Sequence, residues 1–305
     1  MPRSQLAAVA LIAMSLTASF AFAHEIGVVH TPEVDIGYET FGSLGPALPV
    51  IAVNGGPGLS HAYMLVNDLW TKIAEHRLVV FYDQRGTGAS KRLQPGAPQT
   101  MAAQIADLDA VRAKLGLDKP ALVGDSYGGM LAMAYAAAHP EHVGKLILSD
   151  SAAPSWNSMV HLLPQTFPDI EEQDEAEQKR LGDTTEAAAR AGLLNHFKMI
   201  FYSPAKRDAY LTKMGDLGFE PAIGEAVAEA TKDLDLTPSL AGFTGFPTLV
   251  LSGRYDMNVA PLTAWRIAHA IPNAKIVFFE ESGHLPSYEE PEKYRAVLDG
   301  FLDGR

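Results

Sequence analysis

A serine flanked by glycines stands near the middle of the chain. Residues 124–128 read Gly-Asp-Ser-Tyr-Gly, with Ser126 at the centre. An apolar run at 121–123 precedes the motif and an Ala-rich stretch at 130–138 follows it, which predicts a strand, a tight turn and a helix. A serine held at such a turn can attack a carbonyl carbon, and the glycines leave room for the sharp bend. The flanking pattern, more than the five residues alone, makes Ser126 a candidate nucleophile.

Serine is a weak nucleophile unless a histidine accepts its proton and a carboxylate orients that histidine. Asp256 follows a predicted strand at 248–251, and His284 follows a predicted strand at 276–279. Both stand at carboxyl ends of strands, where open α/β sheets place their ligand chemistry. The chain order of Ser126, Asp256 and His284 is that of the α/β-hydrolase triad. The sequence therefore predicts covalent acyl transfer by these three residues, with no metal and no organic cofactor.

A second glycine-rich loop supplies candidate donors for the oxyanion that forms during acyl transfer. Residues 54–58 read Asn-Gly-Gly-Pro-Gly and follow a predicted strand at 50–53. Glycines let main-chain N–H groups approach the substrate carbonyl without obstruction by side chains. We expect the oxyanion hole to consist of the N–H groups of Gly56 and Tyr127, with Gly55 shaping the turn.

The elements that must position these residues alternate along the chain between short apolar runs and longer helical patterns. This order is typical of a parallel sheet with crossover helices, and residues 27–41 resemble an antiparallel pair that leads into it. The fold class is therefore predicted as α/β, with a mostly parallel central sheet flanked by helices. The expected strands are 50–53, 78–82, 121–123, 146–148, 248–251 and 276–279, and the expected helices are 101–115, 126–139, 261–270 and 291–301.

The alternation stops after Asp150 and returns near Phe246, with helical patterns and no convincing strand between. We therefore expect a catalytic domain made of residues 24–150 and 247–305, with a helical cap inserted at 151–246. The cap carries 15 acidic and 8 basic side chains, a net charge of −7 of the −12 of the whole chain. An acidic cap could help to hold a cationic substrate.

Composition and the amino terminus limit the setting in which this chemistry occurs. The 305 residues carry a net charge of −12, which disfavours a nucleic acid partner, and the absence of cysteine excludes disulfides and a thiolate nucleophile. Residues 1–23 combine Arg3, an apolar run at 6–16 and Ala-Phe-Ala at 21–23, which predicts a cleaved signal peptide. A membrane anchor is the alternative, but the segment is short and interrupted by polar residues. We expect a periplasmic or secreted protein with no membrane association after cleavage. The sequence carries no signal for its oligomeric state.

With these motifs in place, the chain resembles the prolyl iminopeptidase family of α/β-hydrolases, which includes the tricorn-interacting aminopeptidases. The resemblance rests on the segments at 54–58, 83–90, 124–129, 253–256 and 282–284, and covers most of the catalytic domain. It implies release of an N-terminal residue, often proline, from short peptides, amides or arylamides. It also implies that Asp83 and Arg85 hold loops beside the site.

The resemblance is imperfect where the substrate amine should bind. Asn54 replaces the usual histidine, and Met257 stands where some relatives carry a glutamate that binds the amine. Glu220 and Glu225 of the cap could take over that role, so the candidate substrate-binding residues are Gly55, Glu220, Glu225 and Met257.

Two other functions stay open at this stage. An esterase or lactonase acting on small uncharged acyl substrates would use an apolar pocket formed by Met257, Met159, Phe197 and Phe201. A non-catalytic binding protein on the same scaffold would be expected to lack a triad residue or an oxyanion glycine, and none is missing.

Overall fold

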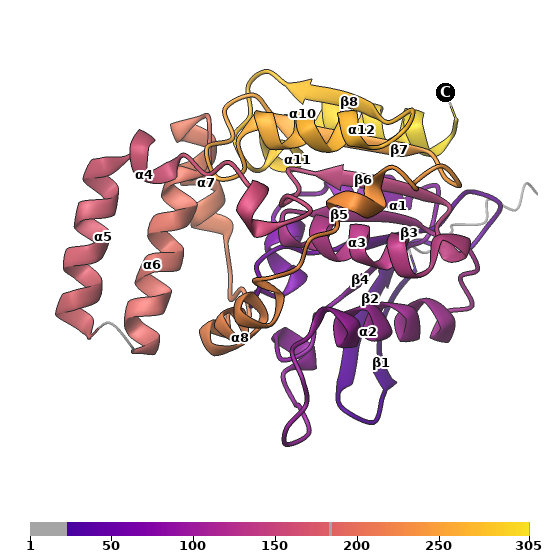
Figure 1. Cartoon of the computed structure of the whole chain (residues 1–305), viewed down its shortest axis with the longest axis horizontal. Coiled ribbons are helices and arrows are strands. Elements are labelled where there is room, and N and C mark those ends of the chain that lie inside the picture. Colours follow the sequence, from indigo (N-terminus) through magenta and orange to yellow (C-terminus); the bar gives the residue numbers. More distant parts are fainter. Residues whose placement is uncertain (1–22, 183–184, 305) are drawn as a thin grey trace, which may run out of the picture.

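The computed structural model describes residues 23–182 and 185–304, so nearly all of the predicted signal peptide lies outside the described residues. Its centre is an eight-stranded sheet with the strand order β1-β2-β4-β3-β5-β6-β7-β8 (Figure 1). Strands β3 to β8 are parallel, whereas β1 pairs antiparallel with β2 and β2 pairs antiparallel with β4. The predicted α/β class with a mostly parallel sheet is confirmed.

The strands form where the sequence has short, mostly β-branched apolar runs. In β3 and β4 every residue is buried, as expected for a sheet with both faces covered. The predicted strands are all present; the ends of β3 to β8 differ from prediction by at most two residues, and β1 begins three residues before the predicted antiparallel pair. The strand bounds are β1 His24–His30, β2 Asp35–Phe41, β3 Val50–Val53, β4 Val79–Tyr82, β5 Ala121–Asp125, β6 Lys145–Ser149, β7 Thr248–Gly253 and β8 Lys275–Phe279.

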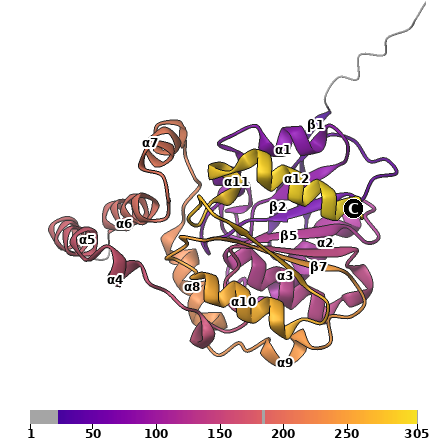
Figure 2. The ribbon, with the colours of Figure 1, turned by 90° about the horizontal axis from the view of Figure 1, so that it is seen from above.

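Helices cover both faces of the sheet and bury two separate apolar clusters against it (Figure 2). On one face lie α2 (Met101–Lys114), α3 (Tyr127–Ala138) and α10 (Pro261–Ala270). On the other face lie α1 (Leu69–Ala74) and α12 (Pro291–Leu302). Helix α3 is apolar on all sides and almost wholly buried, so it forms the centre of its layer.

Between β6 and β7 the described residues form helices and no strand. Helices α4 to α7 stand to one side of the sheet, and α8 lies closer to it (Figure 1). A third apolar cluster joins this helical segment to the sheet domain, with Phe197, Tyr210 and Leu217 packed against Tyr63 and Leu285. The helix bounds are α4 Leu163–Thr166, α5 Pro168–Leu181, α6 Glu186–Met199, α7 Pro204–Lys213, α8 Pro221–Thr231 and α9 Thr237–Leu240.

The remaining short elements lie in the connections around the sheet. Across residues 23–182 and 185–304, every helix is too short or too polar to cross a lipid bilayer. The short elements are the helix α11 Pro286–Glu289 and the 3₁₀ turns η1 His61–Leu65, η2 Gly88–Ser90, η3 Pro140–His142 and η4 Trp156–Ser158.

Candidate active site

Ser126 lies at the sharp turn between β5 and α3. Its backbone has φ 51° and ψ −122°, a conformation that L-residues rarely adopt, and α3 begins at the next residue, Tyr127. The turn is tight because β3 passes directly beside it: a side chain at Gly128 would collide with the carbonyl oxygens of Val53 and Asn54. The local sequence therefore holds Ser126, which is half-buried, in the strained turn typical of a nucleophilic serine.

His284 and Asp256 come together from the loops that follow β8 and β7. Nδ1 of His284 lies 2.7 Å from Oδ2 of Asp256, and both side chains are buried. Oδ1 of Asp256 accepts the backbone N–H groups of Asn258 and Val259, each at 2.9 Å. These bonds fix the carboxylate, which in turn fixes the ring orientation of His284.

The electrostatic surroundings favour His284 as a proton acceptor. Burial alone would lower the pKa of His284, but the charge and hydrogen bond of Asp256, together with the charge of Asp125, outweigh burial and raise it. His284 and Ser126 line the same cavity, and Nε2 of His284 lies 3.1 Å from the side-chain amide nitrogen of Asn258. Among the described residues, no hydrogen bond joins His284 to Ser126. Catalytic hydrogen bonds in a site without substrate are often loose and tighten when substrate binds.

A second buried carboxylate, that of Asp150, lies close to Asp256 and His284. Candidate ligand atoms of Asp150, Asp256 and His284 lie within 4.8 Å of one another. Burial and the charge of Asp256 raise the pKa of Asp150 well above its ordinary value, while its Oδ1 accepts the N–H of Gly253 at 2.8 Å. Asp150 thus anchors the end of β7, the strand that leads to Asp256.

The loop after β3 lies against the nucleophile turn. A Cβ at Gly55 would stand 2.8 Å from the Cβ of Ser126, so only glycine fits there without displacing the serine. The N–H of Gly55 donates to the hydroxyl of Tyr63 at 2.6 Å. Gly56 and Tyr127, which the sequence predicts as the oxyanion donors, both line the cavity beside Ser126, and the N–H of Tyr127 begins a helix and has no acceptor within it. Their role in binding the oxyanion stays a prediction.

Asn54, where relatives usually have histidine, holds this loop from inside. Its side-chain amide donates to the carbonyl oxygens of Gly55 at 2.9 Å and Leu59 at 2.8 Å. The side-chain amide of Gln84 donates in turn to the carbonyl oxygen of Asn54 at 2.6 Å. The asparagine is therefore buried, stabilises the shape of the loop and does not line the cavity at Ser126.

Asp83 and Arg85 brace neighbouring loops. Oδ1 of Asp83 accepts the ring and the backbone N–H of His61, at 2.7 and 3.0 Å, and its Oδ2 accepts the N–H of Ala89 at 2.7 Å. The buried guanidinium of Arg85 makes a two-pronged contact with Asp107, at 2.6 and 2.8 Å. Neither residue lines the cavity at Ser126.

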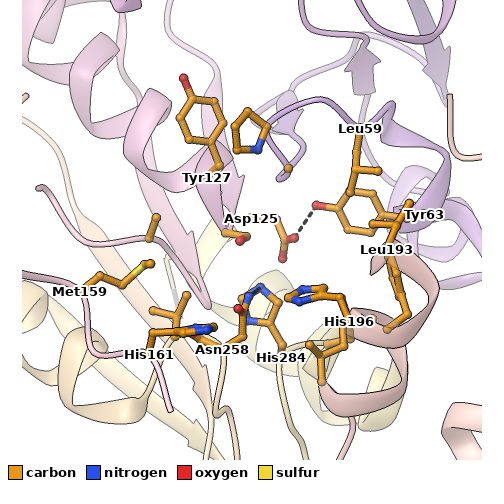
Figure 3. A pocket seen from close by; sticks show the side chains of 18 of the residues that line it. Leu59, Tyr63, Asp125, Tyr127, Met159, His161, Leu193, His196, Asn258 and His284 are labelled. Atoms are coloured by element: carbon orange, nitrogen blue, oxygen red, sulfur yellow. Dashed lines mark hydrogen bonds between the residues drawn. The ribbon is translucent and has the colours of Figure 1, made fainter. Parts of the chain in front are cut away.

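Ser126 and His284 line a cavity of about 470 Å³ next to the helical segment, whereas Asp256 is buried and does not line it. Figure 3 shows side chains of the cavity wall, His284 among them. Leu193, His196, Phe197 and Ile200 line the cavity from that segment, and most of its wall is apolar. Burial lowers the pKa of His196 to about 3, so this ring is neutral at physiological pH. The other lining residues are Gly56, Pro57, Leu59, Tyr63, Asp125, Ser126, Tyr127, Ala152, Trp156, Met159, His161, Phe219, Asn258, Val259, His284 and Leu285.

The cap carboxylates expected to bind an amine stand elsewhere. Glu220 lines a different, polar cavity near His61, and Glu225 lies exposed on α8. Met257 packs in the cluster between cap and sheet domain and is not part of the cavity wall. Gly55 does not line the cavity and packs against Ser126.

The apolar pocket foreseen for an uncharged acyl group is present in part. Met159 and Phe197 line the cavity, whereas Phe201 belongs only to the adjacent apolar cluster. An acyl group would therefore meet apolar side chains from two parts of the segment between β6 and β7, Met159 near its start and Phe197 on α6.

Sequence reasoning missed most of the cavity wall, including the polar residues Asp125, Tyr63 and Asn258. Asp125 stands inside the nucleophile motif, so its position next to Ser126 was a signal, whereas Tyr63 and Asn258 gave none. Tyr63 reaches the site from η1 and donates its hydroxyl to Asp125, as the dashed line in Figure 3 shows.

The fold and the triad together define a serine hydrolase of the α/β-hydrolase class. The family model of the alpha/beta hydrolase fold matches residues 49–291. A proline iminopeptidase of Lactobacillus delbrueckii subsp. lactis is 32% identical over 277 residues, covering 83% of this chain and 90% of the relative. A proline iminopeptidase of Clostridium botulinum is 34% identical over 280 residues, covering 85% and 91%. The chain belongs to the proline iminopeptidase family.

Solved structures agree with this fold. The esterase RhEst1 from a Rhodococcus species superposes with a TM-score of 0.73, at 21% identity, covering 91% of this chain and 98% of the esterase. At this level of identity the likeness concerns the fold, and the substrate has to be argued from the cavity.

Proposed function

We propose that this chain is an aminopeptidase that releases N-terminal residues, proline or another small residue, from short peptides, amides or arylamides. The observation that carries the proposal is the cavity in which Ser126 and the His284–Asp256 pair meet an apolar wall containing one carboxylate. The names of the two similar relatives, both proline iminopeptidases, point to the same substrate class.

The proposed reaction begins when His284 takes the proton of Ser126 as the serine oxygen attacks the substrate carbonyl carbon. Asp256 stabilises the imidazolium that forms, and the N–H groups of Gly56 and Tyr127 bind the oxyanion. The C–N bond then breaks, and His284 gives its proton to the leaving amine. Water attacks the acyl-enzyme with His284 again as the base, which releases the amino acid and restores Ser126.

A short acyl ester is the second candidate substrate, because most of the cavity wall is apolar and would accept an uncharged acyl chain. The two candidates differ in whether they need a free amine. Alcohols are better leaving groups than amines, so ester cleavage alone does not argue against an aminopeptidase.

The experiment compares proline and alanine arylamides with their N-acetylated forms and with a short acyl ester. We expect kcat/KM to fall by roughly 100-fold or more when the amine is blocked, because the carboxylate in the cavity wall, Asp125, then has no cationic partner. Ser126→Ala serves as the control and should remove activity on every substrate. Equal cleavage of free and blocked amides would reject the aminopeptidase and favour the esterase.

We also propose that the chain is exported and that its signal peptide is removed near Ala23. The support is the charged start, the apolar run and the small-residue pattern of residues 1–23. Strand β1 begins at His24, so cleavage there leaves the sheet whole. N-terminal sequencing of protein from the source cells should find a chain starting near His24 outside the cytoplasm. A full-length chain retained in the cytoplasm would refute export.

A further inference from the structure

One acid in the cavity wall belongs to neither the triad nor the loops that support it. Asp125 is the last residue of β5 and directly precedes the nucleophile, and Figure 3 shows its carboxylate between Tyr63 and His284. It is the only carboxylate among the lining residues, all of which belong to the described part of the chain. The mechanism above gives it no role.

One oxygen of Asp125 is held and the other is available. Oδ2 accepts the hydroxyl of Tyr63 at 2.5 Å, and the Tyr63 oxygen accepts the N–H of Gly55 at 2.6 Å. Among residues 23–182 and 185–304, no donor reaches Oδ1, and that atom is not sealed inside the protein. A carboxylate fixed by one hydrogen bond thus presents its second oxygen on the cavity side.

The charges around the cavity favour a cation at this oxygen. The lining contains no Lys or Arg, His196 is neutral, and His284 is the lining group whose positive charge acts on Asp125. Burial raises the pKa of Asp125 to about 6, against the opposing charge of His284 and the hydrogen bond of Tyr63, so the group is largely ionised above neutral pH. An ionised carboxylate in such surroundings gains stability when a positive group enters.

The position of Asp125 fits a charge close to the reacting carbonyl. A Cβ at Gly55 would lie 2.8 Å from the Cβ of Ser126 and 2.9 Å from the hydroxyl oxygen of Tyr63. The Asp125–Tyr63 pair is therefore next to the nucleophile. In an α-amino acyl group the nitrogen is two bonds from the carbonyl carbon. A carboxylate at this place can meet that nitrogen while Ser126 attacks.

We propose that Asp125 binds the α-ammonium group of the substrate, with Tyr63 holding the carboxylate, and thereby selects a free amino terminus. This inference rests on the proposed aminopeptidase function. It moves the amine site from the cap glutamates to the nucleophile motif itself. Asp125 is then a specificity-determining residue that touches the substrate without taking part in bond making.

The test compares wild type with Asp125→Asn, which keeps the shape and an acceptor for the Tyr63 hydroxyl but removes the charge. The substrates are proline arylamide and an aryl ester of a short fatty acid, which has no amine. We expect the ratio of kcat/KM for the arylamide to kcat/KM for the ester to fall roughly 10- to 100-fold, mostly through the KM of the arylamide. A loss common to both substrates reports the missing charge beside His284. Retained ester cleavage also shows that the variant is folded.

Three further measurements separate the outcomes. Glu220→Gln and Glu225→Gln should leave the arylamide-to-ester ratio unchanged, and a large loss in either would return the amine site to the cap and overturn the inference. Tyr63→Phe should lower the same ratio by a smaller factor, which keeps the inference testable should Asp125→Asn not fold. If wild type needs a free amine and Asp125→Asn needs it equally, the inference fails while the aminopeptidase function stands. If wild type cleaves no free-amine substrate, the proposed function itself fails.

Discussion

At the scale of residues, the site depends on how burial changes the charge of a few side chains. Asp256 is fixed by two backbone N–H groups and holds His284. In the part of the chain that the structure describes, the carboxylate of Asp125 accepts a hydrogen bond only from the Tyr63 hydroxyl. The pairing of Asp256 with His284 could be predicted because the loops after two strands identify both residues, whereas the role of Ser126 as nucleophile stays a prediction. The place of Asp125 in the cavity could not be predicted, because it depends on Tyr63, which comes from a segment 62 residues away without a recognisable pattern.

The raised pKa of Asp125 predicts a cost to stability that appears as pH rises. Burial raises the folded-state pKa to about 6 from an ordinary 3.8, so the folded state keeps a proton that the unfolded state has lost in this window. The stabilising contribution of the protonated carboxyl is therefore complete below about pH 4 and is lost as pH rises through 6, by roughly 3 kcal/mol in all. Asp125→Asn should show no such loss.

Urea unfolding of wild type and Asp125→Asn from pH 4 to 8 measures this directly. The free energy of unfolding of the variant minus that of wild type should increase with pH and level off above pH 7, so that the variant is the more stable protein at pH 8. A difference independent of pH would mean that the carboxyl group has an ordinary pKa in the folded state.

At the scale of elements, short strands position the site residues, which lie in the turns and loops at the carboxyl ends of these strands. The apolar runs predicted the strands within two residues because a strand buried on both faces requires continuous apolar sequence. The short helices α4 and α9 were not predicted individually, because helices of one turn are fixed by packing and carry too few residues for a periodic pattern.

Helix α11 links the helical segment between β6 and β7 to the loop that carries His284. The buried carboxylate of Glu289 accepts the N–H groups of Gly283 at 2.7 Å, Ser203 at 2.8 Å and Tyr202 at 3.1 Å. The N–H of His284 donates to the carbonyl oxygen of Ile200 at 2.8 Å, close to the same point. One side chain therefore ties the segment after α6 to the loop that carries the base.

Glu289→Gln should weaken this link, because one carboxylate oxygen becomes an N–H₂ group facing backbone donors. We expect the free energy of unfolding to drop by roughly 2–4 kcal/mol and kcat to fall as His284 loses its fixed position. Glu292→Gln, the same change at an exposed position of α12, is the matched control and should alter neither quantity appreciably. Equal thermal stability of the two variants would contradict a role for Glu289 in joining the segments.

At the scale of the whole molecule, the site exists only where the sheet domain and the helical segment meet. The triad comes from the carboxyl ends of β5, β7 and β8, and the apolar wall comes partly from α6. The presence of helices between 151 and 246 could be read from the sequence, but which of their residues face Ser126 could not. Glu220 and Glu225 illustrate this, since nothing in the helical pattern of α8 distinguishes the face toward the cavity from the faces away from it.

The central claim is that Ser126 is acylated during turnover, and peptide-resolved mass spectrometry after reaction with an active-site-directed aryl fluorophosphonate tests it most directly. We expect a single stable adduct on Ser126, formed in proportion to the loss of arylamide cleavage, and none on Ser126→Ala; His284→Ala should react at least 100-fold more slowly. Labelling of another residue as activity disappears, or full labelling of Ser126 with activity retained, would contradict the assignment of the nucleophile.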